Sequence, residues 1–497
     1  MTIETAGRRR PTRQTARRRG PRAAALAILL LLAGCGESDN GPLLVSAIGG
    51  PPALVNPNLR PLDPASAFVV EATAQGLVRF ERSGQIEAAL AQRWIVSDDG
   101  LRYTFRLAPA SWAGDGKASA AQVVERLRAA GGTASRNPLK PLLGAIDEIV
   151  AMTDDVLEIS LKSPRPNFLQ LLAQPELGIL YKGRGSGPYR AEKYRQDAVR
   201  LRPLVAEGGD EPGEDEQIIL RGERAARALV RFGAGDVDFV TGGTVGDLPI
   251  ARAAEPPPQA LRFDPVDGLF GLAFVAEDGP FGSAEARGAI AMAFDRTTLA
   301  ATLGVPDLSP RETLWAAGID GLPAPGAPAW ASMPLPERRA QAAATIGRLS
   351  HGTAPTLRIA LPQGPGYRLV FAHLKRDLRT IGVNAEAVPR EAAADIRLID
   401  EVAPATMASW YLRRFACASS KVCNPEADSM MAAARIAQTP AERADRFREA
   451  DRLLGETAVY IPLTAPVRWH LVSRRLTGFR PNIFGRHPAG ELIAKPR

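Results

Sequence analysis

Apolar and polar side chains recur along this chain with two different periods, and each period predicts a different element. At residues 101–107 the two kinds alternate strictly, which predicts a half-buried strand. Residues 43–48 form a short, mostly apolar run, which predicts a first strand that ends at glycines and prolines. Ser119 and Gln122 have the spacing of a capping box, so we expect a helix to begin there.

The second half of the chain indicates the architecture. Residues 356–361 alternate as a strand, and a helix with one apolar stripe follows between Pro365 and Gly382. Two further strands are expected at 383–387 and 395–399. This order is typical of a βαβ unit, in which the strands are parallel and the helices lie outside the sheet. The pattern therefore predicts an α/β fold.

The first 35 residues have the composition of a targeting segment. Eight arginines precede an apolar run at 23–32, and Leu32, Ala33, Gly34 and Cys35 resemble a lipobox. A run of about ten apolar residues is too short for a bilayer-spanning anchor, which takes about 20. We therefore expect a cleaved signal peptide and a lipid on Cys35. The general secretory route is favoured over the twin-arginine route, because no full twin-arginine motif follows the arginines.

The N-terminal segment also accounts for the basic charge of the chain. The sequence has 62 Lys and Arg against 54 Asp and Glu, and residues 1–34 hold eight Arg and one Glu. Removal of that segment leaves 54 basic and 53 acidic residues, so the mature chain is close to neutral. A near-neutral charge does not indicate nucleic-acid binding, and we expect no nucleic-acid partner.

A chain of this length is expected to form more than one lobe. The mature protein has about 460 residues, which is more than a single hydrophobic core usually accommodates.

Five short segments occur in a fixed order in the first quarter of the chain, namely residues 62–64, 75–78, 89–94, 97–107 and 114–116. In this order they resemble the start of the family 5 extracytoplasmic solute-binding proteins, which are the dipeptide, oligopeptide and nickel binders of ABC importers. Later segments, such as the Gly-Ser-Gly-Pro-Tyr turn at 185–189, extend the resemblance over roughly residues 43–485.

The resemblance implies an α/β fold of the periplasmic binding protein type II, with two lobes around a cleft and an inserted subdomain, as in the large peptide binders. The hinges between the lobes are expected near 262–275 and 470–480. The expected parts are a signal peptide at 1–34, a tether at 35–42, lobe I at 43–265 with an inserted subdomain at about 64–176, lobe II at 266–475, and a C-terminal return to lobe I at 476–497.

The resemblance also implies binding rather than catalysis. We expect a monomeric periplasmic lipoprotein, anchored to the cell membrane or the outer membrane, that captures a peptide or peptide-like solute for an ABC permease and its ATPase. Two alternatives stay open. One is a periplasmic hydrolase on the same scaffold, and the other is a lipoprotein that senses its ligand for a signalling partner.

The ligand is expected between the lobes, beyond the strand at 395–399, because parallel strands present their C-terminal ends to ligands. A cleft needs an aromatic wall and a few polar contacts. Trp410 could instead belong to the core, and the charged candidates to a solvated surface. Peptide binders of the family often carry Asp-Tyr here, where the carboxylate pairs with the peptide amino terminus, and this chain lacks it. The candidates are Asp400, Glu401, Trp410, Tyr411 and Arg413.

The sequence shows no motif for nucleophilic or metal-dependent catalysis, such as Gly-x-Ser-x-Gly or His-Glu-x-x-His. Its four histidines are scattered at positions 351, 373, 470 and 487, which gives little support for a metal site. We therefore expect no catalytic residues, no metal and no cofactor.

Two cysteines remain after the lipobox, Cys417 and Cys423. An oxidising compartment allows them to form a local disulfide, which is the favoured interpretation. Two buried thiols or a pair of metal ligands are the alternatives.

Overall fold

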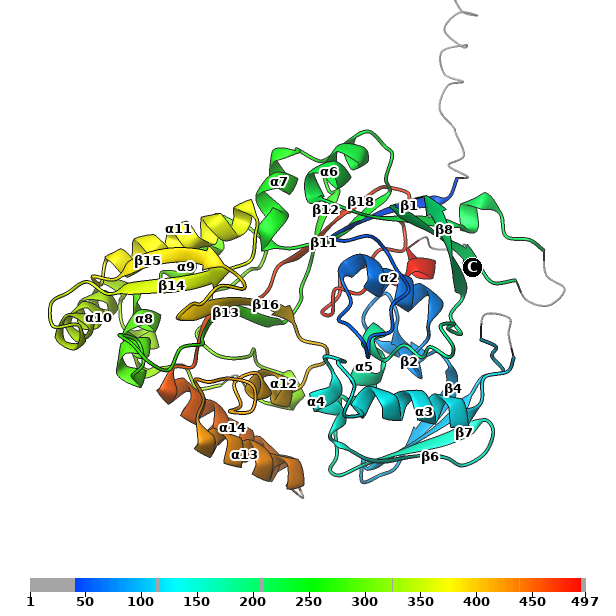
Figure 1. Ribbon diagram of the computed structural model, residues 1–497, viewed down its shortest axis with the longest axis horizontal. Helices are drawn as coiled ribbons and strands as arrows, with labels where there is room; N and C mark the ends of the chain where they lie inside the picture. The colour runs from blue at the N-terminus through cyan, green and yellow to red at the C-terminus, as the bar shows by residue number, and fades with distance from the viewer. Residues whose placement is uncertain are drawn as a thin grey trace, which may run out of the picture. The chain divides into compact units, whose positions relative to one another are not determined.

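The structure is a computed structural model of the 497-residue chain, and it describes residues 41–112, 116–195, 197–205, 210–323, 325–437 and 439–492. The expected signal peptide, Cys35 and most of the tether lie outside the described residues. The described residues from Pro42 onward form one compact unit (Figure 1). None of the described helices is long and apolar enough to cross a membrane.

A seven-stranded sheet contains the first strand of the described chain near its middle. Its strand order is β12-β18-β11-β1-β10-β9-β8, and β1 pairs in parallel with both β10 and β11. Helix α2 (Pro64–Thr73) packs on one face through Phe68 and Val69, which share an apolar cluster with Leu43, Val45 and Ala47. The strands are β1 (Leu43–Ile48), β8 (Tyr189–Arg195), β9 (Ala198–Pro203), β10 (Ile218–Glu223), β11 (Phe239–Gly243), β12 (Leu261–Asp264) and β18 (Arg468–Val472).

An inserted subdomain lies between β1 and β8 in the sequence. Its antiparallel sheet has the order β4-β5-β7-β6, and the strand predicted at 101–107 is β5. The capping box is confirmed, because Ser119 Oγ accepts the Gln122 N–H and Gln122 Oε1 accepts the Ser119 N–H. The elements are β2 (Val78–Phe80), β3 (Ile86–Ala88), β4 (Ala91–Val96), β5 (Arg102–Leu107), α3 (Ala120–Gly131), α4 (Lys140–Leu143), β6 (Ile146–Ala151), β7 (Val156–Leu161) and α5 (Phe168–Leu172).

A five-stranded sheet of order β15-β14-β16-β13-β17 organises the second half of the chain. The predicted βαβ unit is confirmed, because β14 pairs in parallel with β15 and with β16. Strands β13 and β17 are antiparallel to their neighbours, so the sheet is mixed. The strands are β13 (Gly268–Phe274), β14 (Thr356–Leu361), β15 (Asn384–Pro389), β16 (Ile396–Val402) and β17 (Tyr460–Thr464).

Helices surround this second sheet, with α11 near β14 and β15 and the α13–α14 pair on the other side in Figure 1. The apolar stripe expected after Pro365 is present, since Val370, Leu374 and Leu378 of α11 are all buried. The helices of this half are α8 (Ala284–Ala293), α9 (Arg296–Leu303), α10 (Leu335–Leu349), α11 (Pro365–Arg379), α12 (Ala408–Arg413), α13 (Pro425–Ile436) and α14 (Pro440–Thr457). Two earlier helices, α6 (Ala225–Gly233) and α7 (Leu248–Ala253), lie beside the first sheet.

The chain crosses between the two large sheets at residues 265–267 and again at 465–467. We call residues 42–264 and 468–492 the first lobe, and residues 268–464 the second lobe. The second crossing precedes both the expected hinge at 470–480 and the expected boundary at 475, because β18 already pairs with β11 and β12.

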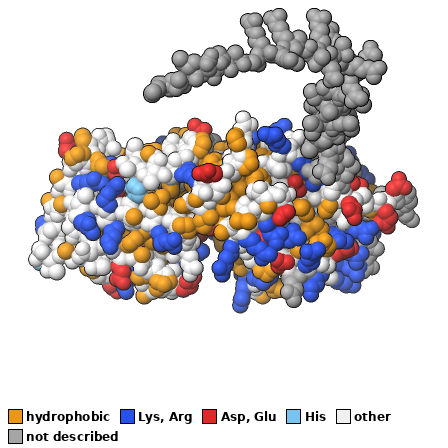
Figure 2. Space-filling view, turned by 90° about the horizontal axis from the view of Figure 1, so that it is seen from above, with side chains coloured by type: hydrophobic (Ala, Val, Ile, Leu, Met, Phe, Trp, Pro, Cys, Tyr) orange, Lys and Arg blue, Asp and Glu red, His pale blue; other side chains and the backbone are white. Residues whose placement is uncertain are grey.

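The chain after β18 stays on the first lobe. Leu476, Phe479 and Leu492 join the apolar cluster around α2, and the Phe484 ring stacks on Phe80 at a centroid distance of 4.4 Å. Figure 2 shows basic and acidic side chains interspersed on one face, with hydrophobic side chains gathered near its middle.

Candidate functional site

A cavity of about 1100 Å³ is lined by residues of both lobes. The first lobe contributes charged side chains that include Asp63, Glu71, Glu176 and Arg468, with the Phe239 ring beside them. The second-lobe residues in the lining that the sequence predicted are Asp400, Glu401, Trp410 and Arg413. The structure therefore brings together four of the five candidate residues at the boundary between the lobes.

Asp400 lies near the C-terminal end of strand β16 and makes an ion pair across that boundary. Its Oδ1 accepts a hydrogen bond from Arg468 Nη1 at 2.7 Å, and its Oδ2 accepts one from the Tyr367 hydroxyl at 2.7 Å. The Asp400 side chain is only 5% exposed. Burial, together with the Asp400 charge, raises the pKa of Tyr367, so its hydroxyl stays a donor. Both carboxylate oxygens are thus already used within the protein.

Glu401, the next residue of β16, has a different environment. Both residues line the cavity, but successive side chains of a strand point to opposite faces, and the Glu401 carboxylate has a different partner from that of Asp400. Its Oε1 accepts from Arg414 Nη2 at 2.8 Å, and the two side chains are 38% and 43% exposed. An exposed pair of this kind is worth at most about 1 kcal/mol.

Trp410 and Tyr411 lie side by side on α12 but do not have the same role in the cavity. Trp410 is part of the lining, whereas Tyr411 is fully buried and is not. Adjacent helical residues are about 100° apart around the axis, which lets Trp410 face the cavity while Tyr411 faces the core. The Tyr411 ring instead contacts Trp410 edge-on at a centroid distance of 4.8 Å, and it supports that ring from behind.

Arg413 is the last residue of α12, and its side chain contacts the inserted subdomain. Its Nη1 donates to the carbonyl oxygen of Pro141 in α4. Burial and the nearby Arg435 lower the pKa of Arg413.

A third link between the lobes runs from the segment after β16 to α5 of the inserted subdomain. Asn167 Nδ2 donates to the Thr406 carbonyl at 2.7 Å, and the Thr406 N–H donates to Gln170 Oε1 at 2.9 Å. Ala405 and Met407 are buried in the apolar core of the inserted subdomain. The second lobe is therefore anchored to that subdomain just beside the cavity.

Asp264, His470 and His487 form a buried group at the first-lobe side of the cavity, and sequence reasoning did not find it. Asp264 Oδ2 lies 2.7 Å from His470 Nε2 and 2.9 Å from His487 Nε2, and its Oδ1 accepts the Asn482 N–H at 3.0 Å. Among the described residues, these three side chains place potential metal ligands within 4.8 Å of one another. The distances are those of hydrogen bonds between two imidazole nitrogens and one carboxylate, so the Asp264 carboxylate has partners without an ion. The buried His470 Nδ1 makes no hydrogen bond with any described group.

The electrostatics of this group support a hydrogen-bonded cluster. Burial would raise the pKa of Asp264, but the interactions with His470 and His487 outweigh it and hold the pKa well below its usual range. Burial also lowers the pKa of His487, with the His470 charge acting in the same direction. The cluster ties the C-terminal segment to strands β12 and β18.

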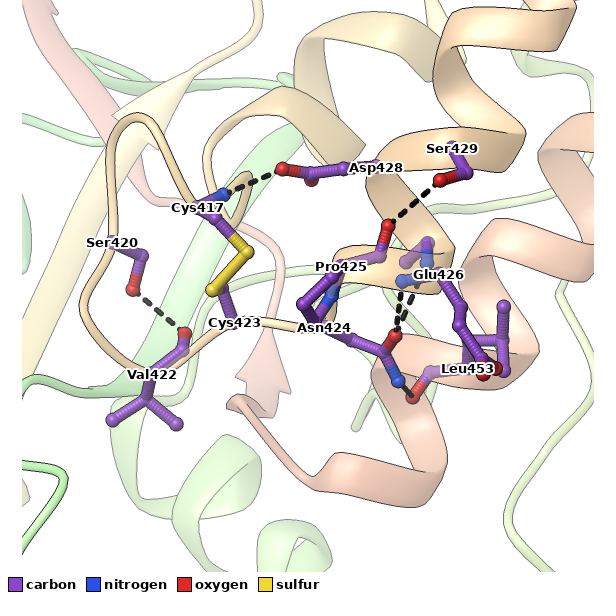
Figure 3. The surroundings of a disulfide bond; sticks show 11 residues. Cys417, Ser420, Val422, Cys423, Asn424, Pro425, Glu426, Asp428, Ser429 and Leu453 are labelled. Atoms are coloured by element: carbon purple, nitrogen blue, oxygen red, sulfur yellow. Dashed lines mark hydrogen bonds between the residues drawn. A yellow bond between two sulfur atoms is a disulfide. The ribbon is translucent and has the colours of Figure 1, made fainter.

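The loop between α12 and α13 is closed by a bond between Cys417 and Cys423, whose Cα atoms are 5.1 Å apart (Figure 3). The Cys417 N–H donates to Asp428 Oδ2 at 3.0 Å. Asn424 caps α13, since its Oδ1 accepts the Glu426 N–H at 2.9 Å (Figure 3). Ala418 and Ser419 of this loop line the cavity, so the disulfide holds part of its rim.

The sequence profile of a family described as "Bacterial extracellular solute-binding proteins, family 5 Middle" matches residues 85–415. Among curated proteins, the probable di/tripeptide-binding protein 5 of Pseudomonas aeruginosa is 24% identical over 489 residues, which cover 84% of this chain and 89% of that protein. The glutathione-binding protein GsiB of Pectobacterium atrosepticum is 31% identical over 154 residues, which cover 28% of this chain and 30% of that protein.

Solved structures agree with the architecture. Haemophilus influenzae OppA, crystallised in complex with the peptide RPPGFSPFR, matches with a TM-score of 0.76 at 17% identity, over 92% of this chain and 98% of that chain. The chain therefore has the α/β fold of the large periplasmic binding proteins, as the sequence predicted.

Proposed function

The chain belongs to the bacterial extracellular solute-binding proteins of family 5, and we propose that it binds a peptide or peptide-like solute between its lobes and delivers it to an ABC permease. The observation that carries the proposal is the cavity of about 1100 Å³ lined by both lobes. A pocket at a domain boundary that combines aromatic and convergent polar groups is where a ligand is expected. Because the family is one of solute-binding proteins, binding is favoured over the hydrolase alternative.

The ligand class follows from the similar proteins. The Pseudomonas relative is named for di- and tripeptides, and the Pectobacterium relative for the tripeptide glutathione. Within the cavity, we propose that Trp410 forms an apolar wall and that Glu401 and Arg413 make polar contacts to the ligand. Asp400 acts indirectly, because it holds Arg468 at the boundary, and Tyr411 acts by supporting Trp410.

Release and uptake of a ligand enclosed by two lobes require the lobes to separate. The crossings at 265–267 and 465–467 are short, and hinge motions are absorbed at a few such residues. We propose these two crossings as the hinge. The Asp400–Arg468 pair and the contacts of Thr406 with α5 then set the preference for the closed arrangement.

Export and anchoring complete the proposal. We propose that Cys35 is lipidated, which would hold the protein at the cell membrane or the outer membrane on its periplasmic side, where it meets the permease and ATPase as a monomer. The lipobox-like sequence before Cys35 supports this.

A thermal-shift screen over di- to pentapeptides, opines, sugars and metal chelates tests the function. A ligand present at about 100 times its dissociation constant should stabilise the protein by about 2.7 kcal/mol. A hit among the peptides supports the proposal. Hits confined to sugars or metal chelates, or hydrolysis of a peptide by the purified protein, would contradict it.

A further inference from the structure

Three arginines line a second, small cavity that adjoins the main one. Arg165, Arg413 and Arg435, which we call the arginine cluster, surround a space of about 30 Å³. Arg413 and Arg435 also line the main cavity, so a ligand there can reach this space with a terminal group. The remaining lining is mostly apolar: Leu142, Ala145, Phe168, Leu171, Met407, Ser409, Met431 and Phe447.

Arg165 is a buried cation whose guanidinium is incompletely hydrogen-bonded among the described residues. It lies between β7 and α5 in the first lobe and is only 7% exposed. Its Nη1 is buried and makes no hydrogen bond with any described group. Burial lowers the pKa of Arg165 to about 10, and nearby Arg443, Arg413 and Arg435 act in the same direction. The guanidinium is still charged at neutral pH.

The local acid does not balance these charges. Asp320 is the acidic group that acts on Arg165, and it also lies 3.5 Å from Arg443 Nη2. Its carboxylate is already committed, because Oδ2 accepts the Ala408 N–H at 2.8 Å and Oδ1 accepts from Asn167 Nδ2 at 3.3 Å. Asp320 therefore acts on two guanidinium groups, those of Arg165 and Arg443, while Arg413 and Arg435 add further positive charge near Arg165. An unpaired buried charge is costly unless an opposite charge is supplied.

The chemistry of the cluster selects a carboxylate. A guanidinium presents a planar fork of N–H donors that matches a carboxylate in two parallel hydrogen bonds. The small volume admits a terminal group, and the apolar residues around it suit the aliphatic carbons that carry that group. We propose that the arginine cluster binds a carboxylate of the peptide ligand, from an acidic side chain or from the carboxyl terminus. This inference rests on the proposed function, and it names the recognised ligand group.

A ligand carboxylate bound by the arginine cluster would also join the two lobes. Arg165 belongs to the first lobe, whereas Arg413 and Arg435 belong to α12 and α13 of the second. Without an anion, these like charges repel one another across the boundary. A carboxylate between them replaces repulsion with attraction, so an acidic ligand stabilises the closed arrangement more than a neutral one.

Calorimetric titration of the mature protein with matched tripeptides tests the proposal. The probes are Ala-Ala-Glu and Ala-Ala-Gln, each with a free and with an amidated carboxyl terminus. For the wild type, removal of the recognised carboxylate should weaken binding at least tenfold. The Glu-to-Gln pair reports on the side chain, and the amide pair reports on the terminus. In Arg165→Met the same removal should change the affinity less than about twofold, because the one buried guanidinium of the cluster is gone.

The melting temperature of the ligand-free Arg165→Met variant is a second measurement. A ligand-binding arginine and a structural arginine predict shifts of opposite sign. Arg165→Met removes an uncompensated charge, so it should raise the melting temperature by about 2 °C. Arg390→Met, an exposed arginine that lines neither cavity, is the control and should change neither affinity nor melting temperature.

The outcomes separate this inference from the function on which it rests. Binding that is independent of both carboxylates, or an equal loss for all four probes in Arg165→Met, would overturn the carboxylate site and leave peptide binding intact. A lower melting temperature for Arg165→Met would also overturn it, since the arginine would then be structural. If none of the four peptides binds the wild type, both this inference and the proposed peptide specificity are wrong.

Discussion

Arg468 Nη1 lies 2.7 Å from Asp400 Oδ1, and the two residues belong to the two large sheets of the protein, β18 and β16. Asp400 is almost fully buried, and Arg468 is 19% exposed. The pair lies in the lining of the main cavity, so one ion pair joins the lobes where the ligand is proposed to bind. Its loss should affect both stability and closure.

Asp400→Leu should therefore destabilise the protein by about 3–5 kcal/mol, because it leaves Arg468 partly buried without its partner. Urea unfolding of the two single variants and of Asp400→Leu with Arg468→Met measures the coupling. The double variant should lose less than the two single variants combined. The neighbouring exposed pair provides the control, and Glu401→Gln should change the free energy of unfolding by less than about 1 kcal/mol. Equal effects of Asp400→Leu and Glu401→Gln would refute the bridging role.

Substitutions of Trp410 and Tyr411 should have different effects on ligand affinity. Trp410→Ala removes the proposed wall and should weaken a confirmed peptide ligand at least about tenfold, or about 1.4 kcal/mol. Tyr411→Phe keeps the ring that supports Trp410 and should bind within about twofold of the wild type. Calorimetric titration with the tightest-binding peptide of the screen measures the affinity of each variant. Wild-type affinity in Trp410→Ala and in Arg413→Ala would show that the site assignment is wrong.

The Asp264 cluster should make stability fall as the pH is lowered. The folded pKa of His487 lies below its unfolded value of about 6.5, so the unfolded state binds the proton first and stability declines below about pH 6.5. The folded pKa of Asp264 also lies below its unfolded value of about 3.9, so a further loss follows below about pH 4.

Urea unfolding at pH 8, 6, 5 and 4 measures this profile. His487→Gln should flatten the slope between pH 6.5 and 5, whereas His351→Gln, at an exposed turn, should leave it unchanged. Stability that rises as the pH falls through this window would contradict the buried, neutral state of His487.

Cys417 and Cys423 should be oxidised in protein exported to an oxidising compartment. The loop is short, so its closure is worth about 2 kcal/mol, and Cys417→Ser with Cys423→Ser should lower stability by up to that amount. Intact mass after alkylation, with and without reductant, reports the bond directly. Two alkylated cysteines in the unreduced protein would rule it out.

Lipidation of Cys35 is tested by expressing the wild type and Cys35→Ser in a bacterium and fractionating the cells. The wild type should be recovered with membranes and carry an acyl mass on its new N-terminal cysteine, whereas the variant should not. Equal solubility of the two, with no acyl mass on the wild type, would exclude the anchor.

Local patterns made the elements of this fold predictable. The alternation at 356–361 and the apolar stripe of α11 depend on the period of each element, and both are present in the structure. The capping box at Ser119 is equally local, since its two partners are three residues apart. Such features depend on neighbours in the sequence, which a single sequence displays.

The site was predictable only in part, because its contacts are distant in the sequence. Arg468 is 68 residues from Asp400, and Tyr367 is 33 residues from it, so nothing local marks them as partners. The Asp264 cluster spans more than 200 residues and was missed for the same reason. The expected boundary at 475 depends on the resemblance, whereas the pairing of β18 with β11 is a tertiary contact.

Native mass spectrometry of the mature protein, purified without unfolding from a culture grown in peptone, tests the central claim most directly. The account predicts a fraction of the protein that carries one peptide per chain, and the loss of that species in Trp410→Ala. A protein that carries no peptide and gains none when incubated with a mixture of di- to pentapeptides would contradict the claim that the cavity between the lobes is a peptide-binding site.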